Sequence, residues 1–190
     1  MTASTPSVHR TIVLVGLMGA GKSSIGRRLA ARLGVAFVDA DAEIEEAAGC
    51  TIPEFFERYG EPAFRDGERR VIARLLNAPP QVMATGGGAF IDPETPALIK
   101  DRAVSVWLRA ELDILVKRCA RRKHRPLLHK GDPREILGNL MAERYPVYEH
   151  ADIIVDSEDG PHEGVVKKIL SALTAWRDGE AAPERPGAAG

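Results

Sequence analysis

Residues 13–26, VLVGLMGAGKSSIG, contain the feature that most constrains this chain. An apolar run ends at Gly16, a run with helical spacing begins after Gly21, and the segment 16–23 matches the pattern G-x-x-x-x-G-K-[ST]. Glycines let backbone N–H groups turn inward and approach an anion closely, and the N-terminus of a following helix adds partial positive charge. The pattern therefore predicts a phosphate-binding loop between a strand and a helix.

The side chains of this loop have distinct expected roles. Lys22 would neutralise the β and γ phosphates of a nucleoside triphosphate, and the Ser23 hydroxyl would be a ligand of Mg²⁺. The motif does not indicate what accepts the phosphate. The residues predicted to bind the nucleotide here are Gly19, Ala20, Gly21, Lys22, Ser23 and Ser24.

Short apolar runs alternate with helical patterns along the rest of the chain. Strands are expected within residues 11–16, 35–41, 81–88, 103–108 and 151–156. Helices are expected within 22–34, 42–49, 51–60, 61–76, 111–122, the first part of 134–150, and 162–177. Short apolar strands separated by helices are typical of a parallel sheet covered on both faces. We expect an α/β fold in three α/β/α layers around a parallel five-stranded sheet, of the P-loop NTPase, nucleoside monophosphate kinase-like type.

Composition limits the domain organisation and the partners. A chain of 190 residues fits one domain, expected over 10–177, with flexible tails at 1–9 and 178–190. Lys and Arg number 26 against 27 Asp and Glu, which argues against non-specific binding to nucleic acid. No apolar run approaches the roughly 18 residues of a membrane-spanning helix. We expect a cytoplasmic protein, a monomer, with two unpaired cysteines.

Two carboxylates follow the second expected strand, whereas the third expected strand ends without one. Asp39 and Asp41 are two residues apart, so in a strand-like backbone they would point the same way, at the edge of the sheet where ligands bind. One could serve Mg²⁺ through water while the other hydrogen-bonds a hydroxyl group. The alternative is that the pair caps a helix that begins near Ala42.

Three further features could contribute to the acceptor site or close over the nucleotide. The three glycines within 85–88 indicate that a ligand approaches the backbone, or else form a tight turn. Arg65 and Arg144 could bind an anion, or could be solvated helical arginines. The basic segment 121–133 could be a lid that carries cations onto the nucleotide, or a solvated loop.

Taken together, the motifs resemble those of the shikimate kinase family. GLMGAGKSSIGRRLA, FVDADAEIE, FRDGE, TGGGA, RPLL and RYPVYEHAD occur in the order and approximate spacing of that family, over about residues 11–175. The resemblance implies phosphorylation of the 3-hydroxyl of shikimate by ATP with Mg²⁺, a step toward chorismate and the aromatic amino acids.

The resemblance also implies a role for each acceptor-site residue. Asp41 would bind the ring hydroxyls of shikimate, and Asp39 would lie near Mg²⁺ and bind it through water. Arg65 and Arg144 would hold the substrate carboxylate, which suits two planar guanidinium groups. Gly87 would contribute a backbone contact.

On the nucleotide side, the resemblance implies that Arg125 is the lid arginine that reaches the phosphates and that Arg118 stacks near adenine. Lys22, Asp41 and Arg125 would then be the catalytic residues. The segment 42–76 is expected to close over shikimate, and the lid 121–133 over ATP. The loop DSEDGPHEG after the last strand departs from the family, which usually has basic residues there, although Pro161 could still pack on the base.

Other functions keep the first motif but explain less of the sequence. Another small-metabolite kinase, such as a gluconate kinase, does not require paired carboxylate-binding arginines. A GTPase would need an N-K-x-D stretch, and a nucleic-acid motor would need more aromatic stacking residues than this chain has. The intact Lys22, Ser23, Asp41 and Arg125 argue against an inactive homologue.

Overall fold

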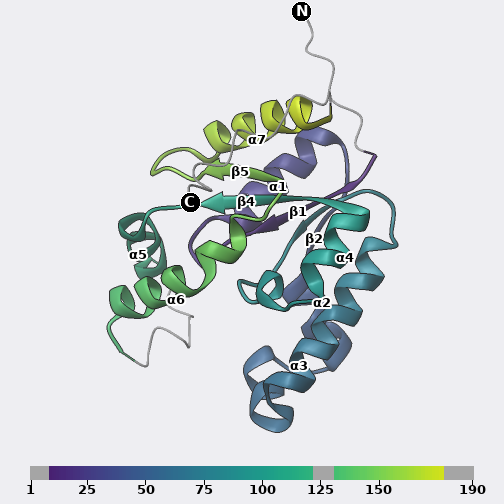
Figure 1. Cartoon of the computed structure of the whole chain (residues 1–190), viewed down its shortest axis with the longest axis vertical. Coiled ribbons are helices and arrows are strands. Elements are labelled where there is room, and N and C mark those ends of the chain that lie inside the picture. The colour runs from purple at the N-terminus through teal and green to yellow at the C-terminus, as the bar shows by residue number, and fades with distance from the viewer. Residues whose placement is uncertain (1–8, 122–130, 178–190) are drawn as a thin grey trace, which may run out of the picture.

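The computed structural model describes residues 9–121 and 131–177, and a parallel five-stranded sheet lies at its centre (Figure 1). The strands lie in the order β2-β3-β1-β4-β5, so β1 pairs with β3 on one side and β4 on the other. Their bounds are β1 Thr11–Val15, β2 Phe37–Asp39, β3 Val82–Ala84, β4 Ala103–Arg109 and β5 Ile153–Asp156. The predicted fold class is confirmed.

Helices cover both faces of this sheet. On one face, the helices α1 and α7 pack against each other, and α1 also contacts β1, β2 and β3 while α7 contacts β5. On the other face, α4 packs against β4, and α3 packs against α4. The bounds are α1 Lys22–Leu33, α2 Ala40–Ala48, α3 Ile52–Leu76, α4 Thr95–Arg102, α5 Leu112–Ala120, α6 Pro133–Tyr148 and α7 His162–Arg177, with a short 3₁₀ helix, η1, at Ala89–Ile91.

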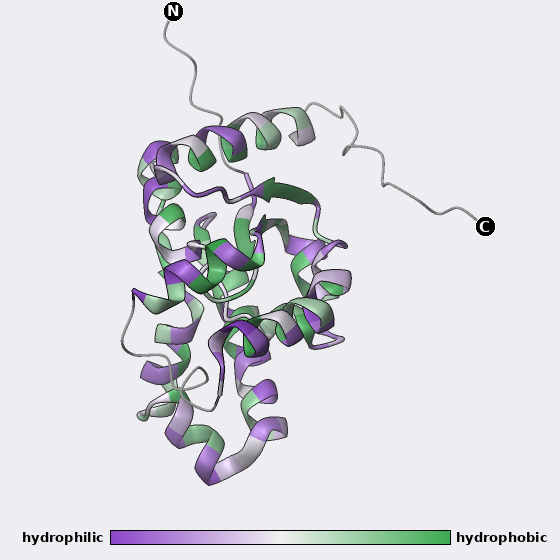
Figure 2. Ribbon diagram, turned by 90° about the vertical axis from the view of Figure 1, so that its left-hand side faces the viewer, coloured by the Kyte–Doolittle hydropathy of each residue, from purple (hydrophilic) through white to green (hydrophobic). Residues whose placement is uncertain are grey.

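The core forms where the apolar strands meet the inner faces of the helices. All five residues of β1 are buried, as are the first six of β4. In Figure 2 the ribbon inside the molecule is largely green, the colour of hydrophobic residues. Leu14 on β1, Ile25 and Leu29 on α1, and Trp107 on β4 are at most 1% exposed. This rigid centre fixes the carboxyl ends of β1, β2 and β3, from which the functional loops leave.

The helix-capping residues expected from the sequence form caps in the structure. Thr51 and Glu54 form a complete capping box at the start of α3, and α1 ends at Gly34, which has a φ of 67°. The two helices expected at 51–60 and 61–76 form one element with a kink at Gly60, where φ is 76°. In Figure 1 this kinked end of α3 extends away from the sheet.

Two elements differ from the expectation. The structure contains α4, which the patterns above do not predict, and α6 continues through Pro146 to Tyr148 instead of ending earlier. A proline so close to a helix end removes only one backbone hydrogen bond. The packing of Tyr145 and Tyr148 on Trp107 offsets that cost.

Some predictions lie outside the described residues. These are the tails 1–8 and 178–190 and the lid residues 122–130, which include Arg125. Within the described part of the chain, no helix has both the length and the apolar character needed to span a bilayer.

Candidate active site

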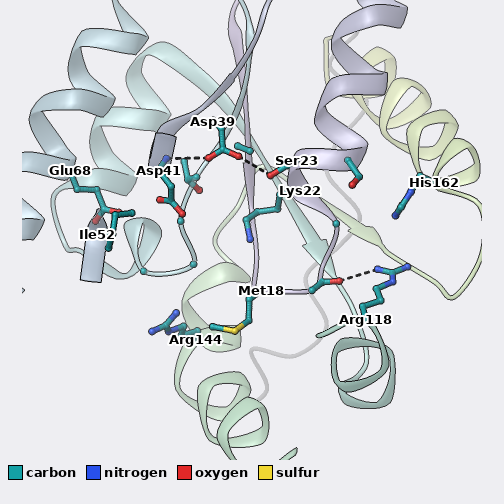
Figure 3. A pocket seen from close by; sticks show the side chains of 18 of the residues that line it. Met18, Lys22, Ser23, Asp39, Asp41, Ile52, Glu68, Arg118, Arg144 and His162 are labelled. Atoms are coloured by element: carbon teal, nitrogen blue, oxygen red, sulfur yellow. Dashed lines mark hydrogen bonds between the residues drawn. The ribbon is translucent and has the colours of Figure 1, made fainter. Parts of the chain in front are cut away.

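A cavity of about 600 Å³ lies at the carboxyl ends of the strands. The loop after β1, the end of β2, the glycine loop after β3 and the loop after β5 all contribute to it, together with α3, α5 and α6. Ligands in open α/β sheets bind at this edge, next to the point where the strand order reverses. Figure 3 shows Lys22 between two ends of the cavity, one with Asp41 and Arg144 and the other with Arg118 and His162.

The loop after β1 is built to receive an anion. Gly21 precedes α1 with a φ of 96°, a conformation that favours glycine, and has no side chain to cap the helix. The first N–H groups of α1 are therefore available to phosphate oxygens. The Lys22 Nζ donates to the carbonyl oxygens of Gly16 at 2.7 Å and Leu17 at 3.1 Å, which holds the ammonium group over the loop.

The predicted nucleotide-binding residues of this loop occupy two kinds of position. Gly19, Gly21, Lys22, Ser23 and Ser24 line the cavity. Ala20 is buried behind the loop at 1% exposure, and its carbonyl accepts a hydrogen bond from Ser157 at 2.9 Å.

The predicted geometry of the acidic pair is wrong, although both carboxylates line the cavity. Asp39 ends β2, but Asp41 lies in the first turn of α2, which begins at Ala40. Asp39 is the N-cap residue, and its carboxylate accepts from the backbone N–H of Asp41 at 3.2 Å. The capping alternative is therefore correct for Asp39, and the helix rather than a strand directs Asp41 into the cavity.

The residues near the first turn of α1 fit a magnesium ion. The Ser23 hydroxyl donates to the Asp39 carboxylate at 2.8 Å, so two hard oxygen ligands lie side by side. Among residues 9–121 and 131–177, no group of three or more histidine, cysteine or carboxylate side chains could hold a metal alone. This donor set suits Mg²⁺, which protein sites commonly share with substrate phosphates and water.

The glycine loop after β3 lies directly against the predicted acceptor-site side chains. A Cβ atom added to Gly86 would lie 2.6 Å from Oδ1 of Asp41, and one added to Gly88 would lie 2.4 Å from a terminal nitrogen of Arg65. Both distances are far below a van der Waals contact. A larger residue at either position would have to displace the side chain of Asp41 or Arg65, which lies against the loop backbone.

We expect Gly88→Ala to weaken acceptor binding while the fold persists. The added methyl group would displace the guanidinium of Arg65, so the KM for the acceptor should rise about tenfold to a hundredfold, the range for a displaced polar contact. Steady-state kinetics against both substrates would measure this. Gly67→Ala is the control, because no atom lies within 4 Å of a Cβ added at Gly67; equal KM values in Gly88→Ala and Gly67→Ala would contradict the prediction.

The two predicted arginines both reach the cavity, from different helices. Arg65 on α3 pairs with Glu68 at 2.6 Å and with Glu61 at 3.2 Å. Glu68 is only 2% exposed, and burial raises its pKa, with Arg65 opposing the rise. The Arg65 guanidinium is thus held in place by carboxylates before any substrate arrives.

Arg144 on α6 faces the glycine loop from the other side. Its Nη1 lies 3.1 Å from the position of a Cβ at Gly87. Its Nε is buried and has no hydrogen-bond partner within the described residues. The nearest carboxylate oxygen, Oε1 of Glu143, lies 4.0 Å away, too far for a hydrogen bond, so this nitrogen is well suited to a ligand oxygen.

Arg118 lies at the opposite end of the cavity, between the phosphate loop and the loop after β5. It donates to the carbonyls of Gly19 and Ala20, each at 3.3 Å, and to the Ser157 hydroxyl at 2.9 Å. Burial lowers its pKa. Arg118 therefore joins two loops in this structure, an arrangement that its position in the sequence does not indicate.

Sequence reasoning missed several cavity residues because they carry no motif. His162 follows the loop after β5 and lines the cavity, and Glu68 lines it as well, although the motif FRDGE indicates no role for this carboxylate. Ser157 at the start of the same loop is buried and does not line the cavity, but it donates to the carbonyl of Ala20 on the phosphate loop at 2.9 Å. His162 lies beside the phosphate loop, with Nε2 3.5 Å from the position of a Cβ at Gly21. The sequence indicates no role for the lining residues Met18, Ile52, Phe56, Phe64, Asp159 and Gly160, whereas Arg121, which also lines the cavity, is the first residue of the expected lid.

The fold and the cavity together define a P-loop kinase of the type that acts on small metabolites. The phosphate loop after β1 lines one part of the cavity, and a compact polar pocket lies beside it. Residues 18–174 match the family model described as shikimate kinase. The chain belongs to the shikimate kinase family.

Individual relatives agree with this assignment. A shikimate kinase from Paramagnetospirillum magneticum is 61% identical over 171 residues, which cover 90% of this chain and 88% of the relative. The structure of shikimate kinase from Acinetobacter baumannii in complex with shikimate has a TM-score of 0.82 and 38% identity, over 87% of this chain and 93% of that chain.

A gluconokinase from Sinorhizobium meliloti has a TM-score of 0.65 at 20% identity, over 91% of this chain and 96% of that chain. At this identity the likeness shows a shared fold alone.

Proposed function

We propose that this protein transfers the γ-phosphoryl group of ATP to the 3-hydroxyl of shikimate. The observation that carries the proposal is the arrangement of one cavity, in which Asp41, Arg65 and Arg144 surround a glycine loop next to Lys22. Such a pocket suits a small carboxylic acid with several hydroxyl groups. The membership of the family and the shikimate complex of the Acinetobacter baumannii relative support the same substrate.

The acceptor end of the cavity supplies orientation. Arg65 and Arg144 would bond the carboxylate of shikimate, and the backbone of Gly87 would contact the ring. Asp41 would accept a hydrogen bond from a ring hydroxyl. Because the glycine loop separates these side chains at fixed distances, a rigid ring would meet all of them at once.

Transfer would be direct and in line, without a phosphoenzyme. Charge develops on the γ-phosphoryl oxygens in a loose transition state, and Lys22 and the N–H groups at the start of α1 would stabilise it. Little proton removal is needed before the new bond forms, so Asp41 would mainly orient the attacking hydroxyl.

Ser23 would bind Mg²⁺ directly and Asp39 through water, and the bound ion would neutralise phosphate charge. Arg118 would lie near adenine.

Closure over both substrates would exclude water from the reaction. We propose that the segment 42–76 closes over shikimate and that the lid 121–133, with Arg125 reaching the phosphates, closes over ATP. The kink at Gly60 gives the first segment a site where the chain direction can change. We further propose that the protein acts as a cytoplasmic monomer with no nucleic-acid or membrane partner.

An assay of ADP release tests the proposed function. The protein would be incubated with ATP, Mg²⁺ and, in turn, shikimate, quinate, gluconate and no acceptor. We expect turnover with shikimate to exceed that with every other acceptor, and phosphate to appear on the 3-hydroxyl. Faster turnover with gluconate would instead favour the alternative kinase.

Asp41 should lower stability at neutral pH as well as orient substrate. Burial raises the pKa of Asp41, the adjacent Asp39 carboxylate adds to the rise, and Lys22 and Arg65 oppose it. The folded protein thus binds a proton at Asp41 more readily than the unfolded chain does. The free energy of unfolding therefore falls as pH increases from the unfolded pKa of about 4 through the raised folded pKa.

We expect Asp41→Asn to raise the free energy of unfolding at pH 7 by about 0.5–2 kcal/mol, as is common when a strained functional group is removed. The gain should disappear below about pH 4, where the wild-type carboxyl group is protonated in both states. Thermal unfolding between pH 3 and 8 measures it. Glu46→Gln is the control, because Glu46 is an exposed residue of the same helix. A variant less stable than wild type at pH 7 would refute this account of Asp41.

A further inference from the structure

Tyr148 is a fully buried residue behind the acceptor end of the cavity. It is the last residue of α6, and its side chain is 0% exposed. It follows Arg144 by four residues, so the two side chains lie on the same face of the helix. Its ring centroid lies 5.8 Å from that of Trp107 and 6.3 Å from that of Phe90. The core therefore fixes the ring and, with it, the position of the hydroxyl group.

The Tyr148 hydroxyl meets two proposed substrate-binding elements at once. It donates a hydrogen bond to the carbonyl oxygen of Gly87. A Cβ at Gly87 would lie 3.7 Å from this hydroxyl and 3.1 Å from Nη1 of Arg144. Burial raises the pKa of Tyr148 to about 12, while the charge of Arg144 and a hydrogen bond with it lower that pKa. The hydroxyl thus stays protonated at neutral pH and donates to Gly87, with the guanidinium of Arg144 beside the same glycine.

This hydrogen bond fixes the direction of a backbone donor in the glycine loop. The carbonyl of Gly87 and the N–H of Gly88 belong to one peptide unit, and in a trans peptide they point in opposite directions. Because Tyr148 holds the carbonyl on the buried side, the N–H of Gly88 points away from the core. The preceding peptide is held as well, since the N–H of Ala89 donates to the Gly86 carbonyl at 3.2 Å.

We propose that Tyr148 is a positioning residue for the acceptor, which holds the glycine loop and Arg144 in register through its hydroxyl group. The identity of the acceptor in this inference rests on the proposed function. The contact between the hydroxyl group and the loop does not depend on it. Tyr148 does not line the cavity and would not touch shikimate. It acts through the Gly87–Gly88 peptide and the guanidinium of Arg144.

The same helix offers a matched control. Tyr145 is three residues away, and its ring packs edge-on against Trp107 with centroids 4.8 Å apart. Its hydroxyl also bonds to backbone, donating to the carbonyl of Ala110 and accepting from the N–H of Ala110 at 3.3 Å. Removing either hydroxyl group takes a hydrogen-bond partner from one backbone carbonyl. Only the hydroxyl group of Tyr148 bonds to the glycine loop.

The first test compares the kinetics of Tyr148→Phe and Tyr145→Phe. Both variants keep the aromatic ring, so both should fold with a comparable decrease in Tm. We expect Tyr148→Phe to raise the KM for shikimate about tenfold or more and to leave the KM for ATP within about twofold, since only the acceptor groups lose their orientation. Tyr145→Phe should change neither constant by more than about twofold. An unchanged shikimate KM in Tyr148→Phe, or the same rise in both variants, would overturn the inference.

A second measurement separates this inference from the proposed function. Amide hydrogen exchange over residues 85–90, without any substrate, should be faster in Tyr148→Phe than in wild type and unchanged in Tyr145→Phe. Should the wild-type protein not phosphorylate shikimate, the proposed function fails, and this exchange result alone decides the role of Tyr148. Equal exchange in wild type and Tyr148→Phe would mean that the hydroxyl does not hold the loop.

Discussion

Replacing Lys22 by methionine should lower kcat by about a thousandfold, the upper end of the range for removing one preorganised donor from a transition state. Lys22 lies between the two ends of the cavity, and its ammonium group is held by the carbonyls of Gly16 and Leu17. In the complex it would donate to phosphate oxygens as their charge develops. Methionine keeps the length of the side chain but removes the charge.

The kinetic pattern distinguishes this role from simple loss of binding. If Lys22 acts mainly in the transition state, kcat and kcat/KM should fall by similar factors, whereas the KM for shikimate should change little. The control is Lys100→Met, because Lys100 is an exposed lysine on α4. A Lys22→Met enzyme with kcat within about tenfold of wild type would show that the loop binds something other than the transferred phosphate.

Removing either arginine of the acceptor pair should raise the KM for shikimate by about a hundredfold. Truncating one partner of a desolvated, hydrogen-bonded charge pair costs about 2–5 kcal/mol, and each guanidinium would face the substrate carboxylate. Arg65→Ala also leaves Glu68 buried without its 2.6 Å partner, so this variant should lose stability as well. Arg144→Ala should affect binding more than stability.

Separate titrations of shikimate and ATP measure this difference. The KM for ATP should stay within about threefold in both variants, because each change removes a cation proposed for the acceptor carboxylate and leaves Lys22 and the N–H groups at the start of α1 in place. Arg70→Ala is the control, since Arg70 is on α3 but its side chain is 78% exposed. A change in the ATP KM alone would mean that Arg65 and Arg144 do not bind the acceptor carboxylate.

Local sequence signals predicted most of the fold. The five strands are short apolar runs, and their alternation with helices leaves few topologies besides a covered parallel sheet. The capping box at Thr51 and Glu54 and the glycines at helix ends mark boundaries that depend on nearby residues only. The helix α4 escaped prediction because its apolar residues show no clear periodicity and no side chain caps its start at Glu94.

Candidate site residues that belong to a sequence motif could be predicted. Residues that reach the site through contacts between distant parts of the sequence could not. Ser157 joins the phosphate loop through the carbonyl of Ala20, 137 residues away. Spacing also failed for Asp41, because Asp39 caps α2 and the helix begins at Ala40, two residues before the expected start at Ala42. No pattern around Tyr148 reveals its contact with Gly87, which requires α6 to continue past Pro146.

A crystal structure with shikimate and a non-hydrolysable ATP analogue tests the central claim most directly. We predict that the shikimate carboxylate lies between Arg65 and Arg144, with a ring hydroxyl bonded to Asp41 and the 3-hydroxyl facing the γ-phosphate beside Lys22. A carboxylate bound elsewhere, with both guanidinium groups turned to solvent, would contradict the account.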